Sequence, residues 1–135
     1  CDNGIVIITG GEPLMWDMNV LTSKLKINKN IVHLETSGAY DITGSWDWVC
    51  LSPKRKKLPK SNMYKIADEL KIIIYNNYDL KFAIEESKKV SKECKLFIQP
   101  EWKRFKRNKN IIIDFIKENP KWQISLQIHK FMDVD

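Results

Sequence analysis

Short apolar runs rich in β-branched residues recur along this chain and constrain its fold more than any other feature. Each run has the length of a strand. The early runs are almost continuously apolar rather than alternating, which is typical of strands in a parallel sheet covered on both faces. The sequence therefore predicts strands at residues 5–8, 31–34, 48–51, 70–74, 95–98 and 123–128.

Helical patterns separate several of these runs. The second pattern starts beside Asp79, a candidate cap, and Pro120 stops the third because its ring disfavours helical geometry in the residue before it. The three helices are expected within residues 16–26, 78–94 and 110–120. Alternating strands and helices predict an α/β fold with mostly parallel strands, and a length of 135 residues predicts a single domain, 1–135.

Composition and charge indicate a soluble protein with no membrane segment. No apolar stretch approaches the length needed to cross a bilayer and no leader pattern is present, so we expect a cytoplasmic protein. Lys and Arg outnumber Asp and Glu by 23 to 17, and the resulting net charge of +6 suits an anionic ligand or a nucleic acid. The three widely spaced cysteines, Cys1, Cys50 and Cys94, indicate neither a disulfide framework nor a zinc module.

Polar and small residues follow five of the expected strands. Because the carboxyl ends of parallel strands meet at one edge of a sheet or barrel, where ligands bind, these residues predict a shared site. We expect Thr9, Glu35, Ser52, Gln99 and His129 on that edge. The five motifs are Thr9-Gly10-Gly11-Glu12-Pro13, Glu35-Thr36-Ser37-Gly38, Ser52-Pro53-Lys54, Gln99-Pro100-Glu101 and His129-Lys130.

Each motif also has a purely structural interpretation. The Gly10-Gly11 pair lets a charged ligand lie against the main chain, but a tight turn explains it equally well. Ser52 and Lys54 can hold a carboxylate, whereas a basic loop is otherwise solvated surface. His129 closes the last expected strand, where a group that titrates near neutrality can meet a substrate.

The strings TGGEPL, LETSG, LSPK, ADELKIII, QPE and SLQIHK, in this order over nearly the whole chain, resemble the 7-carboxy-7-deazaguanine synthase family of radical S-adenosylmethionine (SAM) enzymes. GGEP alone indicates only the wider superfamily, and the terminal SLQIHK is more discriminating. The resemblance implies a partial (β/α) barrel of the radical SAM type. It also implies conversion of a 6-carboxy-tetrahydropterin to 7-carboxy-7-deazaguanine with loss of ammonia, a carbon–nitrogen lyase step of queuosine and 7-deazapurine biosynthesis.

The same resemblance implies cofactors, partners and site residues. The cofactors are S-adenosylmethionine, a 4Fe-4S iron-sulfur cluster and magnesium (Mg2+), and the partners are a second copy in a homodimer and a reductant such as flavodoxin. Matched residue by residue, one set would bind SAM and another the pterin. The SAM set is Gly10, Gly11, Glu12, Ser52, Pro53, Lys54, Gln99, Pro100, Glu101 and Trp102, and the pterin set is Thr9, His129 and the terminal carboxylate of Asp135.

The family's cluster-binding C-x3-C-x2-C segment has no counterpart here, because Cys1, Cys50 and Cys94 do not have that spacing. We therefore expect the cluster ligands, the magnesium ligand and part of the pterin pocket to belong to an amino-terminal portion outside this chain. The chain alone is expected to be inactive. Its first strand is expected to leave an edge that pairs with another chain.

Two other functions fit the same sequence. The chain is alternatively a non-catalytic nucleotide- or pterin-binding module, which a cysteine triplet upstream in the reading frame would argue against. It is alternatively a basic nucleic-acid-binding domain built on SPKRKKLPK and EWKRFKRNK, where aromatic residues alternate with Lys and Arg. Steep salt dependence of nucleic-acid binding would support that function.

Overall fold

A computed structural model describes residues 4–132, which form one sheet of six strands. The strands lie in chain order, and each neighbouring pair is parallel, which confirms the predicted α/β class. The strands are β1 (Ile5–Ile8), β2 (Ile31–Thr36), β3 (Trp48–Leu51), β4 (Glu69–Ile74), β5 (Lys95–Pro100) and β6 (Trp122–Ile124).

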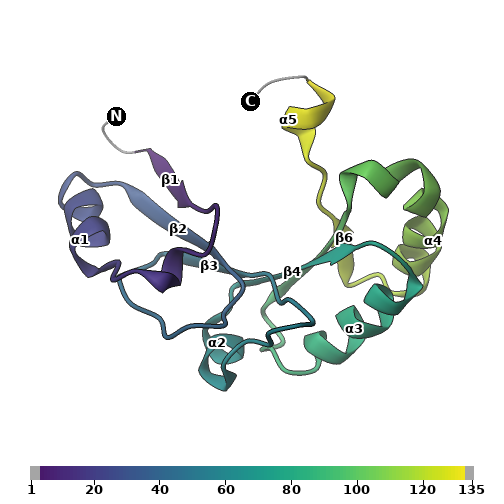
Figure 1. Cartoon of the computed structure of the whole chain (residues 1–135), viewed down its shortest axis with the longest axis horizontal. Coiled ribbons are helices and arrows are strands. Elements are labelled where there is room, and N and C mark those ends of the chain that lie inside the picture. The colour runs from purple at the N-terminus through teal and green to yellow at the C-terminus, as the bar shows by residue number, and fades with distance from the viewer. Residues whose placement is uncertain (1–3, 133–135) are drawn as a thin grey trace.

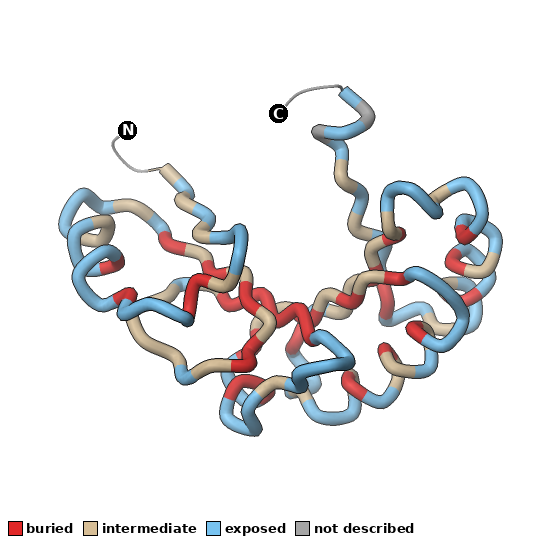
Figure 2. The backbone as a smooth tube through the Cα atoms, viewed as in Figure 1, coloured by how far each residue is buried: buried red, intermediate tan, exposed pale blue. Residues whose placement is uncertain are grey.

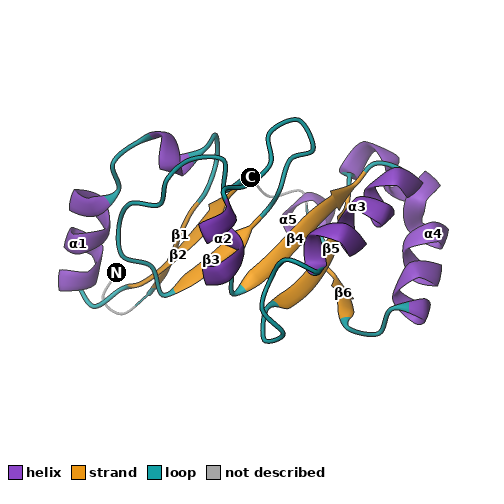
Figure 3. Ribbon diagram, turned by 90° about the horizontal axis from the view of Figure 1, so that it is seen from below, coloured by secondary structure: helices purple, strands orange, loops and turns teal. Residues whose placement is uncertain are grey.

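The sheet curves into an open arc, with helices along its convex side (Figure 1). Figure 3 views the molecule from that side and shows α1 to α4 flanking or crossing the strands. The helices are α1 (Asn19–Ile27), α2 (Ser61–Ile66), α3 (Asn77–Ser87), α4 (Phe105–Glu118) and α5 (Ile128–Phe131), with 3-10 turns η1 (Pro13–Met15) and η2 (Trp102–Arg104). Among residues 4–132, β1 and β6 are the edges of the sheet.

The core lies between the convex face and the helices. Strand β4 buries every second residue, and its Leu70, Ile72 and Ile74 are at most 1% exposed. They pack in one cluster with apolar residues of α2, α3 and α4. Figure 2 shows this burial concentrated in the middle of the sheet and beneath the helices. Because side chains alternate along a strand, the residues between the buried ones point to the concave face.

Helix boundaries differ from the sequence prediction where local polar groups intervene. Asp17 Oδ1 accepts a hydrogen bond from the Asn19 N–H at 2.9 Å, so α1 starts at Asn19 rather than at residue 16. Asn76 caps α3, and Asp79 supports that cap by accepting from the Asn76 N–H at 3.1 Å. Asp79 is therefore a member of a capping box rather than the cap itself.

The other helices differ in length. Helix α3 ends at Ser87 instead of residue 94, α4 begins five residues before the expected position 110, and α2 was not predicted. Helix α4 ends at Glu118, before Pro120, as expected. No helix in the described part of the chain is both long enough and apolar enough to span a membrane.

The predicted last strand over residues 123–128 exists, but its predicted carboxyl end was wrong. Strand β6 ends at Ile124, and the Ser125 N–H makes a last sheet-type bond to the Ile98 carbonyl at 2.9 Å. The next bond of a parallel ladder would need a donor at position 100, where Pro100 has no N–H. The chain leaves the sheet there, and His129 lies in α5 instead of closing a strand.

Candidate functional site

The carboxyl ends of the strands form one edge of the sheet, and four of the predicted strand-end residues lie on it. Thr9 directly follows β1, and Ser52 directly follows β3. Glu35 and Gln99 are the penultimate residues of β2 and β5. The parallel topology therefore brings these four positions to the same side of the molecule.

The chain after β6 reaches the neighbourhood of this edge through α5. The ammonium group of Lys130 lies 5.9 Å from the ring centroid of Trp102 in η2, so α5 sits beside the segment that follows β5. His129 belongs to this helix. Asp135, the other predicted pterin contact of the terminal segment, lies outside the described residues.

Gly10 and Gly11 turn the chain at the end of β1. Their φ angles are +84° and +53°, a left-handed conformation that side chains disfavour. A Cβ atom built at either glycine would meet no atom within 4 Å. The backbone conformation explains why glycine is favoured at both positions, and the open space beside them leaves room for a ligand against the main chain.

The Glu12 carboxylate connects this turn to the end of β2. It accepts hydrogen bonds from the Thr36 hydroxyl at 2.5 Å, the Ser37 N–H at 2.9 Å, the Leu14 N–H at 3.2 Å, and the Ser37 hydroxyl. Partial burial alone would raise the pKa of Glu12, but the hydrogen bonds from Ser37 and Thr36 outweigh it and hold the pKa below its usual range. The Glu12 side chain is thus occupied by the protein itself.

We expect Glu12→Gln to lower the free energy of unfolding at pH 7 by about 1–3 kcal/mol, because the amide offers one acceptor oxygen where the carboxylate offers two. The pKa of Glu12 is lower in the folded state than the ordinary value of 4.5, so the ionised carboxylate stabilises the fold above pH 4.5. This stabilisation is lost as the pH falls through the folded-state pKa. Urea unfolding of both proteins at pH 7 and at pH 3 measures this. A difference that stays constant between the two pH values would contradict the assignment.

A charged cluster lies on the concave face between β2, β3 and β4. Lys71 Nζ is 2.7 Å from Glu35 Oε1, and the two side chains are only 12% and 33% exposed. The strand register places Glu35 beside Cys50 and Cys50 beside Glu69. The Glu69 carboxylate accepts from Trp48 Nε1 and from Cys50 Sγ, each at 3.3 Å. The face turned away from the helices is therefore polar at its centre.

The sequence analysis did not identify Glu69 and Lys71 as site residues. The signal was present, because residues two apart in a strand point to the same face and the intervening Leu70 is apolar. Burial on its own lowers the pKa of Lys71, but the acidic groups around it, including Glu35, outweigh that effect and raise it. Lys71 is thus held as a cation that fixes the Glu35 carboxylate.

The motif after β3 lies next to this cluster. Ser52 is 4% exposed, and Lys54 Nζ lies 3.4 Å from its hydroxyl. Desolvation lowers the pKa of Lys54, and the nearby Glu35 carboxylate partly opposes that shift. Pro53, which lies between Ser52 and Lys54 in the sequence, is buried. Lys54 therefore couples the β3 motif electrostatically to Glu35.

The motif after β5 is partly structural. Gln99 and Pro100 are the last two residues of β5, aligned with Ile73 and Ile74 of β4. Glu101 Oε2 accepts from the Arg104 N–H at 3.1 Å and so caps η2, of which Trp102 is the first residue. The capping contact gives Glu101 a role in shaping this loop.

The described residues do not fit an iron-sulfur cluster. Cys50 and Cys94 are buried, and burial raises the pKa of both thiols, that of Cys94 to about 11. Neither is therefore a ready thiolate ligand at neutral pH. Among the side chains that the structure describes, no group of three or more His, Cys, Asp or Glu is placed to hold a metal ion. Cys1 lies outside the described residues.

Several curated proteins similar to this chain carry the name 7-carboxy-7-deazaguanine synthase. The protein of that name from Flavobacterium psychrophilum is 53% identical over 129 residues, which is 96% of this chain and 61% of the relative. The one from Synechocystis sp. is 45% identical, and the match covers 96% of this chain and 62% of the relative. The chain thus spans about three fifths of the length of these two relatives.

A solved structure shows the same fold. The crystal structure of QueE from Escherichia coli matches with a TM-score of 0.77 at 28% identity, over 91% of this chain and 56% of that one. No family model matches the chain. The synthase of Prochlorococcus marinus is 40% identical over 153 residues and is covered to 68% of its length. Because the chain is 40% identical to this relative and covers 68% of its length, it belongs to the 7-carboxy-7-deazaguanine synthase family.

Proposed function

We propose that this chain is the carboxyl-terminal portion of a radical SAM lyase. The complete protein converts a 6-carboxy-tetrahydropterin to 7-carboxy-7-deazaguanine with loss of ammonia, a step of queuosine biosynthesis. The observation that carries the proposal is the meeting of the TGGEP, ETSG and SPK motifs at one strand edge, with the Glu12 carboxylate bonded to Thr36 and Ser37.

In this proposal, the residues of this chain bind and orient SAM and the pterin. Gly10 and Gly11 hold the methionine end of SAM against open main chain, and Ser52 and Lys54 border the same pocket with Pro53. SAM supplies the radical chemistry when bound, and the protein positions it. The rest of the SAM pocket comes from the main chain at Glu12 and the loop formed by Gln99, Pro100, Glu101 and Trp102.

The pterin lies nearer the terminal segment in the same proposal. Thr9, His129 and the carboxylate of Asp135 contact it, and the ion pair of Glu35 with Lys71 supplies a polar wall on the concave face. The 4Fe-4S cluster and magnesium are held by residues outside residues 4–132. A homodimer, a flavodoxin-type reductant and a cytoplasmic location complete the proposal.

The test joins this chain to the segment of the Flavobacterium relative that it does not cover. Reconstituted anaerobically with iron, sulfide, reductant and magnesium, the joined protein should convert the pterin to 7-carboxy-7-deazaguanine, detected by mass spectrometry. This chain treated identically should give no product. Cleavage of SAM without conversion of the pterin would support the radical SAM activity and contradict the proposed substrate.

Two substitutions in the joined protein separate the two sets of residues. Gly11→Val should weaken SAM binding about tenfold or more, because its side chain enters the space beside the main chain. His129→Ala should lower pterin turnover and leave SAM affinity nearly unchanged. Thermal melts identify variants that have merely lost the fold, and equal SAM affinity in Gly11→Val and the parent would refute the placement of SAM.

A further inference from the structure

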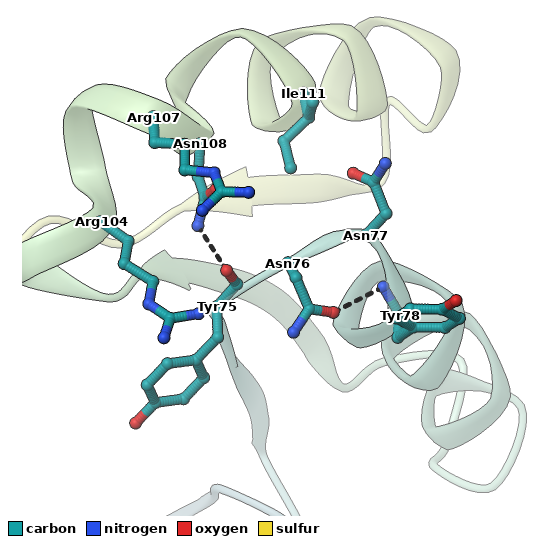
Figure 4. Close-up of a pocket in the computed structure, with 8 residues that line it drawn as sticks. All are labelled: Tyr75, Asn76, Asn77, Tyr78, Arg104, Arg107, Asn108 and Ile111. Atoms are coloured by element: carbon teal, nitrogen blue, oxygen red, sulfur yellow. Dashed lines mark hydrogen bonds between the residues drawn. The ribbon is translucent and has the colours of Figure 1, made fainter.

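A hollow of about 440 Å³ opens between the start of α3 and the start of α4, and the proposed function does not use it. It is lined by two arginines, two tyrosines, three asparagines and one isoleucine (Figure 4). None of these residues belongs to the SAM or pterin sets, and no acidic side chain lines the hollow. The lining combines cations, aromatic rings and amides.

Arg104 and Arg107 supply the charge. Figure 4 shows both side chains extending from the start of α4 toward the β4–α3 turn. Neither forms an ion pair with any carboxylate of the described part of the chain. A pair of guanidinium groups without carboxylate partners beside one hollow suits a phosphate group, which arginine binds with paired N–H donors.

These cations lie at the amino-terminal end of α4, where positive charge destabilises a helix. Lys106 and Arg107 lie in the first turn of α4, Arg104 is its N-cap residue, and no acidic residue occupies that turn. Positive side chains at a helix amino terminus oppose the macrodipole and so weaken the helix. The positive charge is therefore not explained by the stability of α4, whereas an anionic ligand would benefit from it.

Hydrogen bonds hold both walls of the hollow in place. Asn108 is 3% exposed, and its Nδ2 donates to the Tyr75 carbonyl at 2.9 Å and to the Ile74 carbonyl at 3.4 Å. This fixes the first turn of α4, with Arg104 and Arg107, against the end of β4. On the other wall Asn76 Oδ1 accepts from the Tyr78 N–H at 2.8 Å. The site is therefore formed before any ligand arrives.

The tyrosine rings and one amide indicate what accompanies the phosphate. Tyr75 and Tyr78 are 46% and 67% exposed, and the Arg104 guanidinium lies 5.9 Å from the Tyr75 ring centroid. The Asn77 side chain makes no hydrogen bond to other described residues and offers both a donor and an acceptor. A planar base can stack on an exposed ring and bond to the amide.

We propose that this hollow binds a nucleoside monophosphate, with Arg104 and Arg107 on the phosphate and a tyrosine ring against the base. The volume of about 440 Å³ matches small-molecule sites, typically about 300–1,000 Å³, and exceeds what a free phosphate fills. The site binds the nucleotide independently of the proposed reaction.

The test uses the 135-residue chain and calorimetry at low salt. Adenosine 5′-monophosphate should bind about tenfold or more tightly than either adenosine or inorganic phosphate alone. Arg104→Ala/Arg107→Ala should lower that affinity at least about tenfold. Tyr75→Leu/Tyr78→Leu should weaken binding of the nucleotide and leave binding of inorganic phosphate unchanged.

The matched control is Lys92→Ala/Lys121→Ala, which removes the same charge beside a different hollow and should leave the affinity unchanged. Circular dichroism confirms that each variant is folded. Nucleotide affinity that is unaffected by Arg104→Ala/Arg107→Ala would overturn the proposal. So would equal affinity for phosphate and the nucleotide, binding of a short oligothymidylate alone, or no binding of any probe.

Discussion

Gly38→Ala should lower the free energy of unfolding by about 2–5 kcal/mol, which combines a backbone and a packing cost. Gly38 has a φ of +72°, where a Cβ atom is strained. That atom would also lie 2.5 Å from Leu51 Cδ1, 3.0 Å from Pro59 Cβ and 3.3 Å from Met63 Cβ. Urea denaturation at neutral pH measures the loss.

Gly10→Ala is the matched control for this substitution. Gly10 has a similar φ of +84°, but its added Cβ would meet nothing within 4 Å. It should therefore show only the backbone cost of about 1–2 kcal/mol. The difference between the two variants isolates the packing of the ETSG turn against Leu51, Pro59 and Met63. Equal losses at Gly10 and Gly38 would contradict the close packing at Gly38.

Tyr64→Phe should cost about 2–3 kcal/mol, because it removes a hydrogen bond to a buried carboxylate. The Tyr64 hydroxyl donates to Glu86 Oε2 at 2.5 Å, and Glu86 is 1% exposed. Its other oxygen lies 2.6 Å from Lys89 Nζ. Loss of the Tyr64 hydroxyl leaves the Glu86 carboxylate with fewer hydrogen-bond donors at a site that solvent hardly reaches. Tyr78→Phe, at a ring that is 67% exposed, should change stability by less than about 0.5 kcal/mol.

A double-mutant cycle tests whether the charge causes this loss. In the background Glu86→Leu no carboxylate remains, so adding Tyr64→Phe should cost less than it does in the parent protein. Thermal and urea unfolding of the four proteins give the coupling energy. An equal cost of Tyr64→Phe in both backgrounds would show that the packing of the hydroxyl, rather than its hydrogen bond to Glu86, matters.

The strands were predictable because their signal is local. The apolar runs that form β1 and β3 end where the sequence prediction placed them, at Ile8 and Leu51. Strands β2 and β5 extend two residues beyond their runs, into Glu35-Thr36 and Gln99-Pro100. The polar residues Glu35, Thr36 and Gln99 still fit the ladder, because the backbone rather than the side chain supplies its hydrogen bonds. The prediction that the strand-end residues share one edge of the sheet required only that the strands be parallel.

The partners within the site could not be predicted, because they depend on chain segments that are distant in sequence. Glu12 and Ser37 are 25 positions apart, and only the pairing of β1 with β2 brings them together. Lys71 meets Glu35 across β3. Helix α2 was missed for another reason, because six residues are too few to show a helical period.

The order of the strands has a consequence for how the chain gains its structure. Because β1 to β6 lie side by side in chain order, each strand pairs with its neighbours in sequence. Each connection between consecutive strands closes within the stretch of chain that directly follows the first strand, and the entropic cost of closing such a connection grows only slowly with its length. A ribosome-bound chain can therefore add one strand and its helix at a time to a sheet that already exists, so the growing edge is always the most recently synthesised strand.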